Sequence, residues 1–168
     1  MALPILDALA AVEDTPGLHF RRATALRMMG RLPEAAHELD LVAAKSPEFP
    51  GIHMERTRIF LAPPSPDPER GLSEVSRHIE TAPNDAGALM FRGAAYEMLG
   101  EASAAEADYR RALELNPAFG GASLRLASLL LREGRIPEAR AVLADRLGRE
   151  PGDAVARGLA ESLSDTGP

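Results

Sequence analysis

Two histidines occupy matching places in the chain. The pentapeptide PGLHF, which contains His19, returns thirty-four residues later as PGIHM, which contains His53. Imidazole is a common metal ligand and general base, so a recurring histidine is a candidate for either role. Equivalent side chains on stacked helices lie roughly 10 Å apart, too far to share one ion without other ligands. His37 and His78 have no neighbour at a convincing ligand spacing, and we predict no metal site.

The other residue types that could do chemistry are also poorly placed for it. The chain has no cysteine, which excludes disulfides, thiolate metal sites and cysteine nucleophiles. None of the serines stands in a strand-to-helix elbow, and the GG at 120–121 lacks the preceding strand and following lysine of a phosphate loop. Carboxylates, as in EASAAEAD, have the spacing of a solvated helix face. We therefore expect no enzyme activity, no catalytic residue and no cofactor.

Size, composition and charge define the class of protein. At 168 residues the chain has room for a single domain with a sizeable core, and 45% apolar against 26% charged residues is a globular composition. The formal net charge of −6 argues against nucleic acid and anionic membranes as partners. No apolar run approaches a membrane span, so we expect no membrane insertion. The apolar start contains Asp7 and follows no basic residue, which favours a cytoplasmic location.

The recurring histidine belongs to a longer internal repeat. GRLPEA at 30–35 returns as GRIPEA at 134–139, a separation of three thirty-four-residue periods plus two residues. The prolines that would close successive units are Pro47, Pro83, Pro117 and Pro151. Their spacing places the two extra residues in the second unit, which contains the proline-rich stretch at 62–71. His19 and His53 recur because the unit recurs, and we interpret them as structural residues.

Each unit has the pattern of two amphipathic helices joined by a tight turn. Gly30 and Gly134 suit the end of a first helix, while Pro33 and Pro137 suit the first turn of a second helix. Small residues recur where the two helix axes must approach closely. They are Ala23, Thr57, Gly93 and Ala127 on the first helices, and Ala35, Gly71, Ala105 and Ala139 on the second helices.

The unit from Asp85 to Pro117 resembles the tetratricopeptide repeat family. The residues that carry the resemblance are Leu89, Gly93, Tyr96, Ala105, Tyr109, Ala112 and Pro117. The resemblance implies an all-α fold, a right-handed superhelical α-solenoid of about four helix-turn-helix repeats within a single domain spanning 1–168. The expected repeats are 16–49, 50–85, 86–119 and 120–153. The second departs from the family pattern in its proline-rich turn and in His78, and the fourth departs in Arg146.

Terminal segments are expected to cap the array, because end repeats otherwise expose an apolar face. Residues 1–15 are predicted to contain an N-terminal capping helix over residues 2–12. Residues 154–168 are predicted to form a C-terminal capping helix followed by a disordered tail. Asp153 is expected to be the N-cap of that helix, with Val155, Leu159 and Leu163 turned inward.

The resemblance implies that the first helices line a concave groove in which a partner binds. Reading residues three or four apart along those helices predicts a partner-binding stripe. Its members are Phe20, Thr24, Arg27, Met28, Met54, Arg58, Leu61, Met90, Ala94, Glu97, Met98, Leu124, Ser128, Leu131 and Arg132. Methionine adapts its conformation to apolar surfaces of variable shape. The arginines would select acidic flanks on the ligand, whereas Phe20 and Met90 do not fit the family's clamp for acidic chaperone tails.

These features predict a bacterial-type, non-enzymatic protein-protein interaction scaffold. Its partner would be a protein or peptide with an apolar or amphipathic segment held in the groove. Three alternatives stay open: an export or secretion chaperone that masks a client segment, an accessory domain of a larger transferase-type enzyme, and an oligomeric scaffold that self-assembles through its end repeats.

Overall fold

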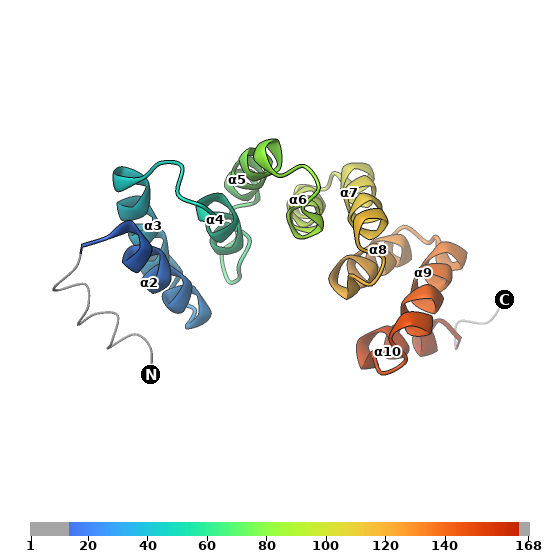
Figure 1. Cartoon of the computed structure of the whole chain (residues 1–168). Helices are drawn as coiled ribbons and strands as arrows, with labels where there is room; N and C mark the ends of the chain where they lie inside the picture. The colour runs from blue at the N-terminus through green and yellow to red at the C-terminus, as the bar shows by residue number, and fades with distance from the viewer. Residues whose placement is uncertain (1–13, 165–168) are drawn as a thin grey trace. The chain divides into compact units, whose positions relative to one another are not determined.

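The computed structural model describes residues 14–164, and all regular elements in this range are α-helices. The expected N-terminal helix over residues 2–12 and most of the expected tail fall outside the described residues. The chain divides into two compact units, one up to Thr81 and one from Ala82 onward. The first contains α2 (Pro16–Met28), α3 (Leu32–Lys45), α4 (Ile52–Phe60) and α5 (Pro68–Thr81). The second contains α6 (Ala86–Met98), α7 (Ala102–Leu115), α8 (Gly120–Arg132), α9 (Ile136–Arg149) and α10 (Ala154–Ser164) (Figure 1).

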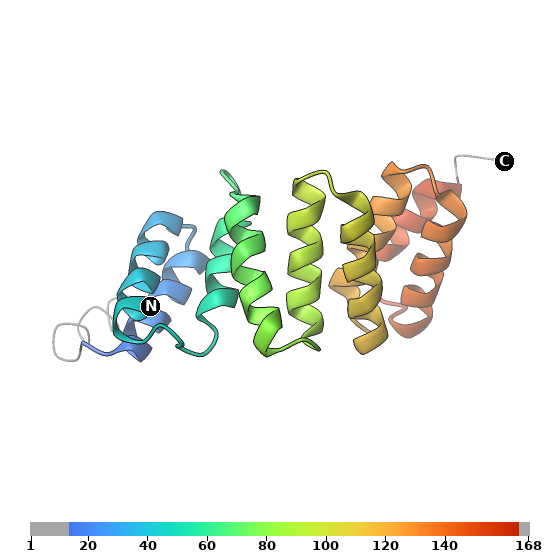
Figure 2. The ribbon, with the colours of Figure 1, turned by 90° about the horizontal axis from the view of Figure 1, so that it is seen from above.

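Consecutive helices form pairs, as the repeat pattern predicts. The pairs are α2 with α3 and α4 with α5 in the first unit, and α6 with α7 and α8 with α9 in the second. Figure 2 shows α6 and α7, coloured lime and yellow, lying alongside each other. The second helix of each pair also packs on the first helix of the next pair within its unit, as α3 does on α4 and α7 on α8. Each unit is therefore built from the same two-helix element.

Small residues lie where the paired helices touch. All eight that the repeat pattern singled out are buried. A Cβ atom added at Gly93 would lie 2.6 Å from the ring of Tyr109 and 3.2 Å from the backbone oxygen of Ala105. One added at Gly71 would lie 2.5 Å from the side chain of Leu61. Glycine is needed at Gly93 because the Tyr109 ring and the Ala105 backbone fill the space that a Cβ would take, whereas at Gly71 a Cβ would require the Leu61 side chain to shift.

The turns inside the pairs use the residues that the sequence indicated. Gly30, Gly100 and Gly134 have φ angles of 75°, 81° and 74°, which are accessible to glycine at little cost. Pro33 and Pro137 lie in the first turns of α3 and α9, where the missing N–H has no intrahelical partner to lose. The turn between α4 and α5 lacks such a glycine, and α4 is shorter, with nine residues.

Helix starts and buried clusters complete each unit. The side chains of Thr15, Asp85 and Asp153 accept hydrogen bonds from backbone N–H groups at the starts of α2, α6 and α10, which confirms the predicted cap at Asp153.

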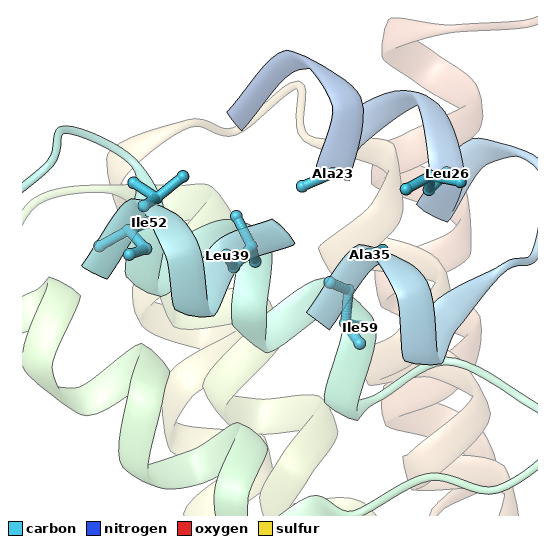
Figure 3. Packing of buried hydrophobic residues seen from close by; sticks show 7 residues of the cluster. Ala23, Leu26, Ala35, Leu39, Ile52 and Ile59 are labelled. Carbon is cyan, nitrogen blue, oxygen red and sulfur yellow. The ribbon is translucent and has the colours of Figure 1, made fainter. Parts of the chain in front are cut away.

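The first unit has one cluster of buried hydrophobic residues, which Figure 3 shows between α2, α3 and α4. It is formed by Ala23, Leu26, Ala35, Leu39, Val42, Ile52 and Ile59. The second unit has two clusters, centred on Tyr109 and Leu126 and on Leu143 and Ala156.

The predicted inward face of the C-terminal helix was wrong at one residue. Val155 is 60% exposed, whereas Ala156 and Leu163 are buried and Leu159 is half-buried. Successive residues of a helix are about 100° apart, so a stripe through 156, 159, 160 and 163 leaves Val155 on its edge. Ala156 was overlooked because a small residue contributes little to an apolar pattern.

Candidate partner-binding faces

The predicted stripe residues lie on the first helices of both units, and we treat each unit separately. The first-unit face consists of Phe20, Thr24, Arg27 and Met28 on α2 with Met54, Arg58 and Leu61 on or just after α4. The second-unit face consists of Met90, Ala94, Glu97 and Met98 on α6 with Leu124, Ser128, Leu131 and Arg132 on α8. Met28, Met98 and Arg132 are exposed, and Met54, Leu61 and Ala94 are buried. The other nine are half-buried.

A buried carboxylate organises the arginines of the first-unit face. Glu55 on α4 is 2% exposed and accepts hydrogen bonds from Arg27 at 2.7 Å and Arg58 at 3.1 Å. Arg27 comes from α2, so this pair also ties the two first helices of the unit together. Burying a carboxylate is costly unless its charge is compensated, and here two guanidinium groups compensate it. Two guanidinium groups therefore surround a single carboxylate in this cluster.

The second-unit face has a similar cluster in which the carboxylate lies on the other first helix. Glu97 on α6 accepts hydrogen bonds from Arg132 of α8 and from the hydroxyl of Tyr109, each at 2.6 Å, and Arg125 lies 3.8 Å away. Burial, followed by the hydrogen bond to Glu97, raises the pKa of Tyr109 well above its usual value, so the phenol stays a donor. In the first unit the carboxylate, Glu55, lies on α4 of the second helix pair. In the second unit the carboxylate, Glu97, lies on α6 of the first helix pair.

Exposed methionines lie beside both clusters. Met28 and Met98 are seventy residues apart and hold the same position at the last residue of α2 and of α6. Their exposed fractions are 76% and 45%. Met29, the next residue after α2, is 58% exposed. The only other large apolar side chain that is exposed among residues 14–164 is Val155, on α10. Each unit therefore presents methionine at the end of its leading first helix.

Several apolar stripe residues help to pack their own unit. The ring of Phe20 packs against the ring of Phe49, with centroids 5.1 Å apart and planes tilted by 38°. The sulfur of Met90 lies 3.0 Å from where a Cβ of Gly121 would be, which brings it against the start of α8. Leu124 and Leu131 pack against the buried cluster around Leu143, and Met90 and Leu131 pack against the cluster around Tyr109.

The recurring histidines each bind a carboxylate on the second helix of their own pair. His19 Nδ1 lies 2.6 Å from Glu38, and His53 Nδ1 lies 2.7 Å from Glu74. Among residues 14–164, no three His, Asp or Glu side chains are grouped so that they could hold a metal ion. Sequence analysis missed these partners, although both glutamates occupy the same place in successive repeats.

A second repeated pair was also missed. An arginine on the first helix faces a carboxylate on the second helix in three consecutive repeats. The pairs are Arg22 with Glu38 at 2.9 Å, Arg56 with Glu74 at 3.6 Å and Arg92 with Asp108 at 2.7 Å. The arginine and the carboxylate are sixteen residues apart, or eighteen in the lengthened second repeat, and this regular spacing could have revealed the pairs in the sequence. In the fourth repeat the equivalent residues are Leu126 and Val142.

Comparison with known proteins agrees with this architecture. Residues 97–163 match the family model of the tetratricopeptide repeat. The structure of TTC0263, a thermophilic protein from Thermus thermophilus, is 26% identical, with 97% of this chain and 89% of that chain covered and a TM-score of 0.78. A MamA structure from Desulfovibrio magneticus is 19% identical over 91% and 86% of the two chains, with a TM-score of 0.80. The structure of YrrB is 16% identical, with 95% of this chain and 81% of that chain covered and a TM-score of 0.71.

The fold class is thus the all-α helix-pair solenoid that the repeats predicted. Residues 97–163 have the sequence pattern of the tetratricopeptide repeat, and the described residues have the fold of solved tetratricopeptide repeat structures. A search of the curated proteins finds no match. None of the helices in the described range is both long enough and apolar enough to cross a membrane.

Proposed function

We propose that the chain is a non-enzymatic protein-binding module whose first-helix faces hold an apolar or amphipathic segment of a partner protein. The observation that carries the proposal is the pair of exposed methionines, Met28 and Met98, at equivalent positions of α2 and α6. A side chain that only packs its own unit would be buried, as Met54 is. Methionine at an exposed site offers a partner an adaptable apolar contact.

The charged clusters add a preference for acidic residues in the partner segment. On the second-unit face Arg125 and Arg132 share Glu97, so a ligand carboxylate could bond to a guanidinium there without meeting net negative charge. Arg132 is the most accessible of these, with 59% of its side chain exposed. Hydrogen bonds between guanidinium and carboxylate groups are stronger than neutral ones. We infer a ligand whose apolar anchor is followed or preceded by Asp or Glu.

Similar structures are consistent with this proposal. YrrB is described as a tetratricopeptide protein with an unusual peptide-binding site. Burying one exposed methionine contributes roughly 1.5–3 kcal/mol before ordering and association costs. Because those costs cancel much of the gain, the expected Kd is on the order of micromolar.

Peptide selection on the isolated protein tests the proposed function. A random peptide library displayed on phage would be panned against the wild-type chain, and the selected peptides measured by fluorescence polarisation. We expect selected sequences that combine an aliphatic or aromatic anchor with acidic neighbours. Met28→Glu should weaken peptides that bind the first-unit face about ten-fold or more, and Met98→Glu should do the same to peptides that bind the second-unit face, because each places a charge in an apolar contact.

Val155→Glu is the matched control, since Val155 is comparably exposed but lies on α10. Circular dichroism should show unchanged helix content in all three variants, because the substituted residues are on the surface. Selected peptides that bind Met28→Glu, Met98→Glu and wild type equally well would show that the first-helix faces are not the binding surface.

A further inference from the structure

Methionine sulfur atoms are the most readily oxidised groups of this chain. The sequence contains six methionines but no cysteine and no tryptophan. Peroxides oxidise cysteine thiolates and methionine thioethers, so in a chain without cysteine the thioethers react first. Which of them a dissolved oxidant reaches depends on how far the fold exposes each side chain.

The described methionines divide into an exposed and a buried set. Met28, Met29 and Met98 are 76%, 58% and 45% exposed. Met54 on α4 is only 6% exposed. Met90 on α6 is half-buried, and its sulfur lies against the start of α8. A small oxidant in solution can therefore reach three of these five side chains without any opening of the fold.

All three exposed methionines lie at the ends of the leading first helices. Met28 and Met98 are the last residues of α2 and α6, and Met29 follows Met28 directly. Each helix end also carries a member of a charged cluster, Arg27 in the first unit and Glu97 in the second. Within residues 14–164, every exposed methionine is thus on a candidate partner-binding face or next to one.

Oxidation by hydrogen peroxide changes the sulfur atom and leaves the backbone intact. The sulfur lone pair attacks one peroxide oxygen, and the S–O bond forms as the O–O bond breaks. The hydroxide that leaves takes the proton of the transferred hydroxyl group and becomes water. Sulfur is oxidised by two electrons, the peroxide is reduced by two, and an apolar thioether becomes a polar, chiral sulfoxide.

We propose that Met28, Met29 and Met98 are oxidation sites at which a peroxide weakens partner binding. The sulfoxide oxygen is a hydrogen-bond acceptor, and burying it against an apolar segment removes its water without supplying a donor. The adaptable apolar contact that an unmodified methionine offers is then lost. The loss of binding rests on the proposed function, whereas the selectivity among the methionines rests on exposure alone.

The fold tolerates the change at these three residues. Their side chains are in water before oxidation, so the sulfoxides remain hydrated and the core packing is kept. At Met54 the same change would place a polar oxygen in a buried site, at a cost to stability. A peroxide reaches Met54 only when the unit opens locally. Oxidation therefore acts on the binding faces before it damages the core.

Peptide mapping after peroxide treatment tests the selectivity. The whole protein would be exposed to hydrogen peroxide for increasing times, quenched with catalase, digested and analysed by tandem mass spectrometry. We expect Met28, Met29 and Met98 to be oxidised at least about ten-fold faster than Met54, with unchanged helix content by circular dichroism. In urea, where the fold is lost, the four rates should become similar. Equal rates for Met28 and Met54 in the folded protein would overturn the assignment.

Peptide binding tests the consequence of the modification. The peptides selected by phage display, restricted to those without methionine, would be added to oxidised protein after removal of the peroxide. Fluorescence polarisation should show about ten-fold weaker binding than to untreated protein, because a sulfoxide replaces an apolar anchor contact.

Two leucine variants locate the effect. Met28→Leu with Met29→Leu and Met98→Leu keeps apolar side chains but removes the exposed sulfur atoms, so peroxide should leave its peptide affinity unchanged. Met54→Leu with Met90→Leu is the matched control, and it should lose affinity on oxidation as the wild type does. Leucine and methionine have similar volumes, so both variants should fold. Loss of affinity in the first variant equal to that of the wild type would overturn the proposal.

The outcomes separate this inference from the proposed function. A peptide that Met28→Glu or Met98→Glu weakens, but that binds oxidised and untreated protein equally, would overturn the oxidation effect while the proposed function stands. A peptide that neither the glutamate variants nor peroxide weaken would overturn both. The order in which peptide mapping finds the methionines oxidised decides the site assignment in either case, since that measurement needs no ligand.

Discussion

His19 lies between two carboxylates at the start of the first pair. Its Nδ1 is 2.6 Å from Glu38 and its Nε2 is 2.6 Å from Asp14, which also bonds to Lys45. Both ring nitrogens can donate only when the imidazole is protonated. Burial alone lowers the pKa of His19, but the hydrogen bonds to Glu38 and Asp14 outweigh it, so the pKa is raised above the usual value.

This raised pKa predicts the direction of a pH effect on stability. A group whose pKa is higher when folded stabilises the protein fully below the unfolded pKa, near 6.5 for histidine, and loses that contribution as pH rises through the folded pKa. We expect the urea midpoint to fall as pH is raised from neutral into the mildly alkaline range. His19→Gln should remove this component of the pH dependence.

NMR titration of the imidazole checks the same prediction directly. The His19 Cε1 proton should titrate above the usual range, and Glu38→Gln should shift the titration to lower pH because it removes one charged acceptor. His37, which is exposed on α3, supplies the control variant His37→Gln. A His37→Gln protein with the same altered pH profile as His19→Gln would remove the basis for this interpretation.

At the scale of helices, the close approach of α6 and α7 depends on Gly93. Valine at this position would place a Cβ within 2.6 Å of the buried Tyr109 ring, and two further methyl groups beyond it. Overpacking of this kind costs about 1–3 kcal/mol, so Gly93→Val should lower the free energy of unfolding by about 2 kcal/mol. Chemical denaturation followed by circular dichroism measures the change.

Gly158 supplies the matched control for the Gly93 substitution. It also lies within a helix, α10, but its added Cβ would meet nothing within 4 Å beyond its chain neighbours and the backbone of its own helix. Gly158→Val should therefore change stability by less than about 0.5 kcal/mol. Equal destabilisation by the two substitutions would mean that contact with Tyr109 does not determine the effect, since helix propensity alone favours valine over glycine.

Sequence patterns predicted the helices well and the side-chain partners poorly. The small residues, turn glycines and first-turn prolines act through the local backbone, so their spacing was sufficient to place the pairs. Glu55 was missed because its role depends on Arg27, which lies one repeat earlier and is brought near only by packing.

At the scale of the whole molecule, the division into two units predicts how the chain unfolds. Stability in repeat proteins is approximately a sum over repeats and their nearest-neighbour contacts, so destabilisation can stay local. Leu39 and Leu143 are both fully buried, one in each unit, and either leucine-to-alanine change should cost about 2–5 kcal/mol.

Native-state hydrogen exchange should separate the two units. Leu39→Ala should lower amide protection in α2, α3, α4 and α5 while α7, α8 and α9 keep theirs, and Leu143→Ala should do the reverse. Such a pattern would make each unit a separate cooperative element, able to open without the other. Equal loss of protection in all helices in both variants would instead mean that the chain unfolds as a single cooperative unit, and that a ligand bound on one unit stabilises the other.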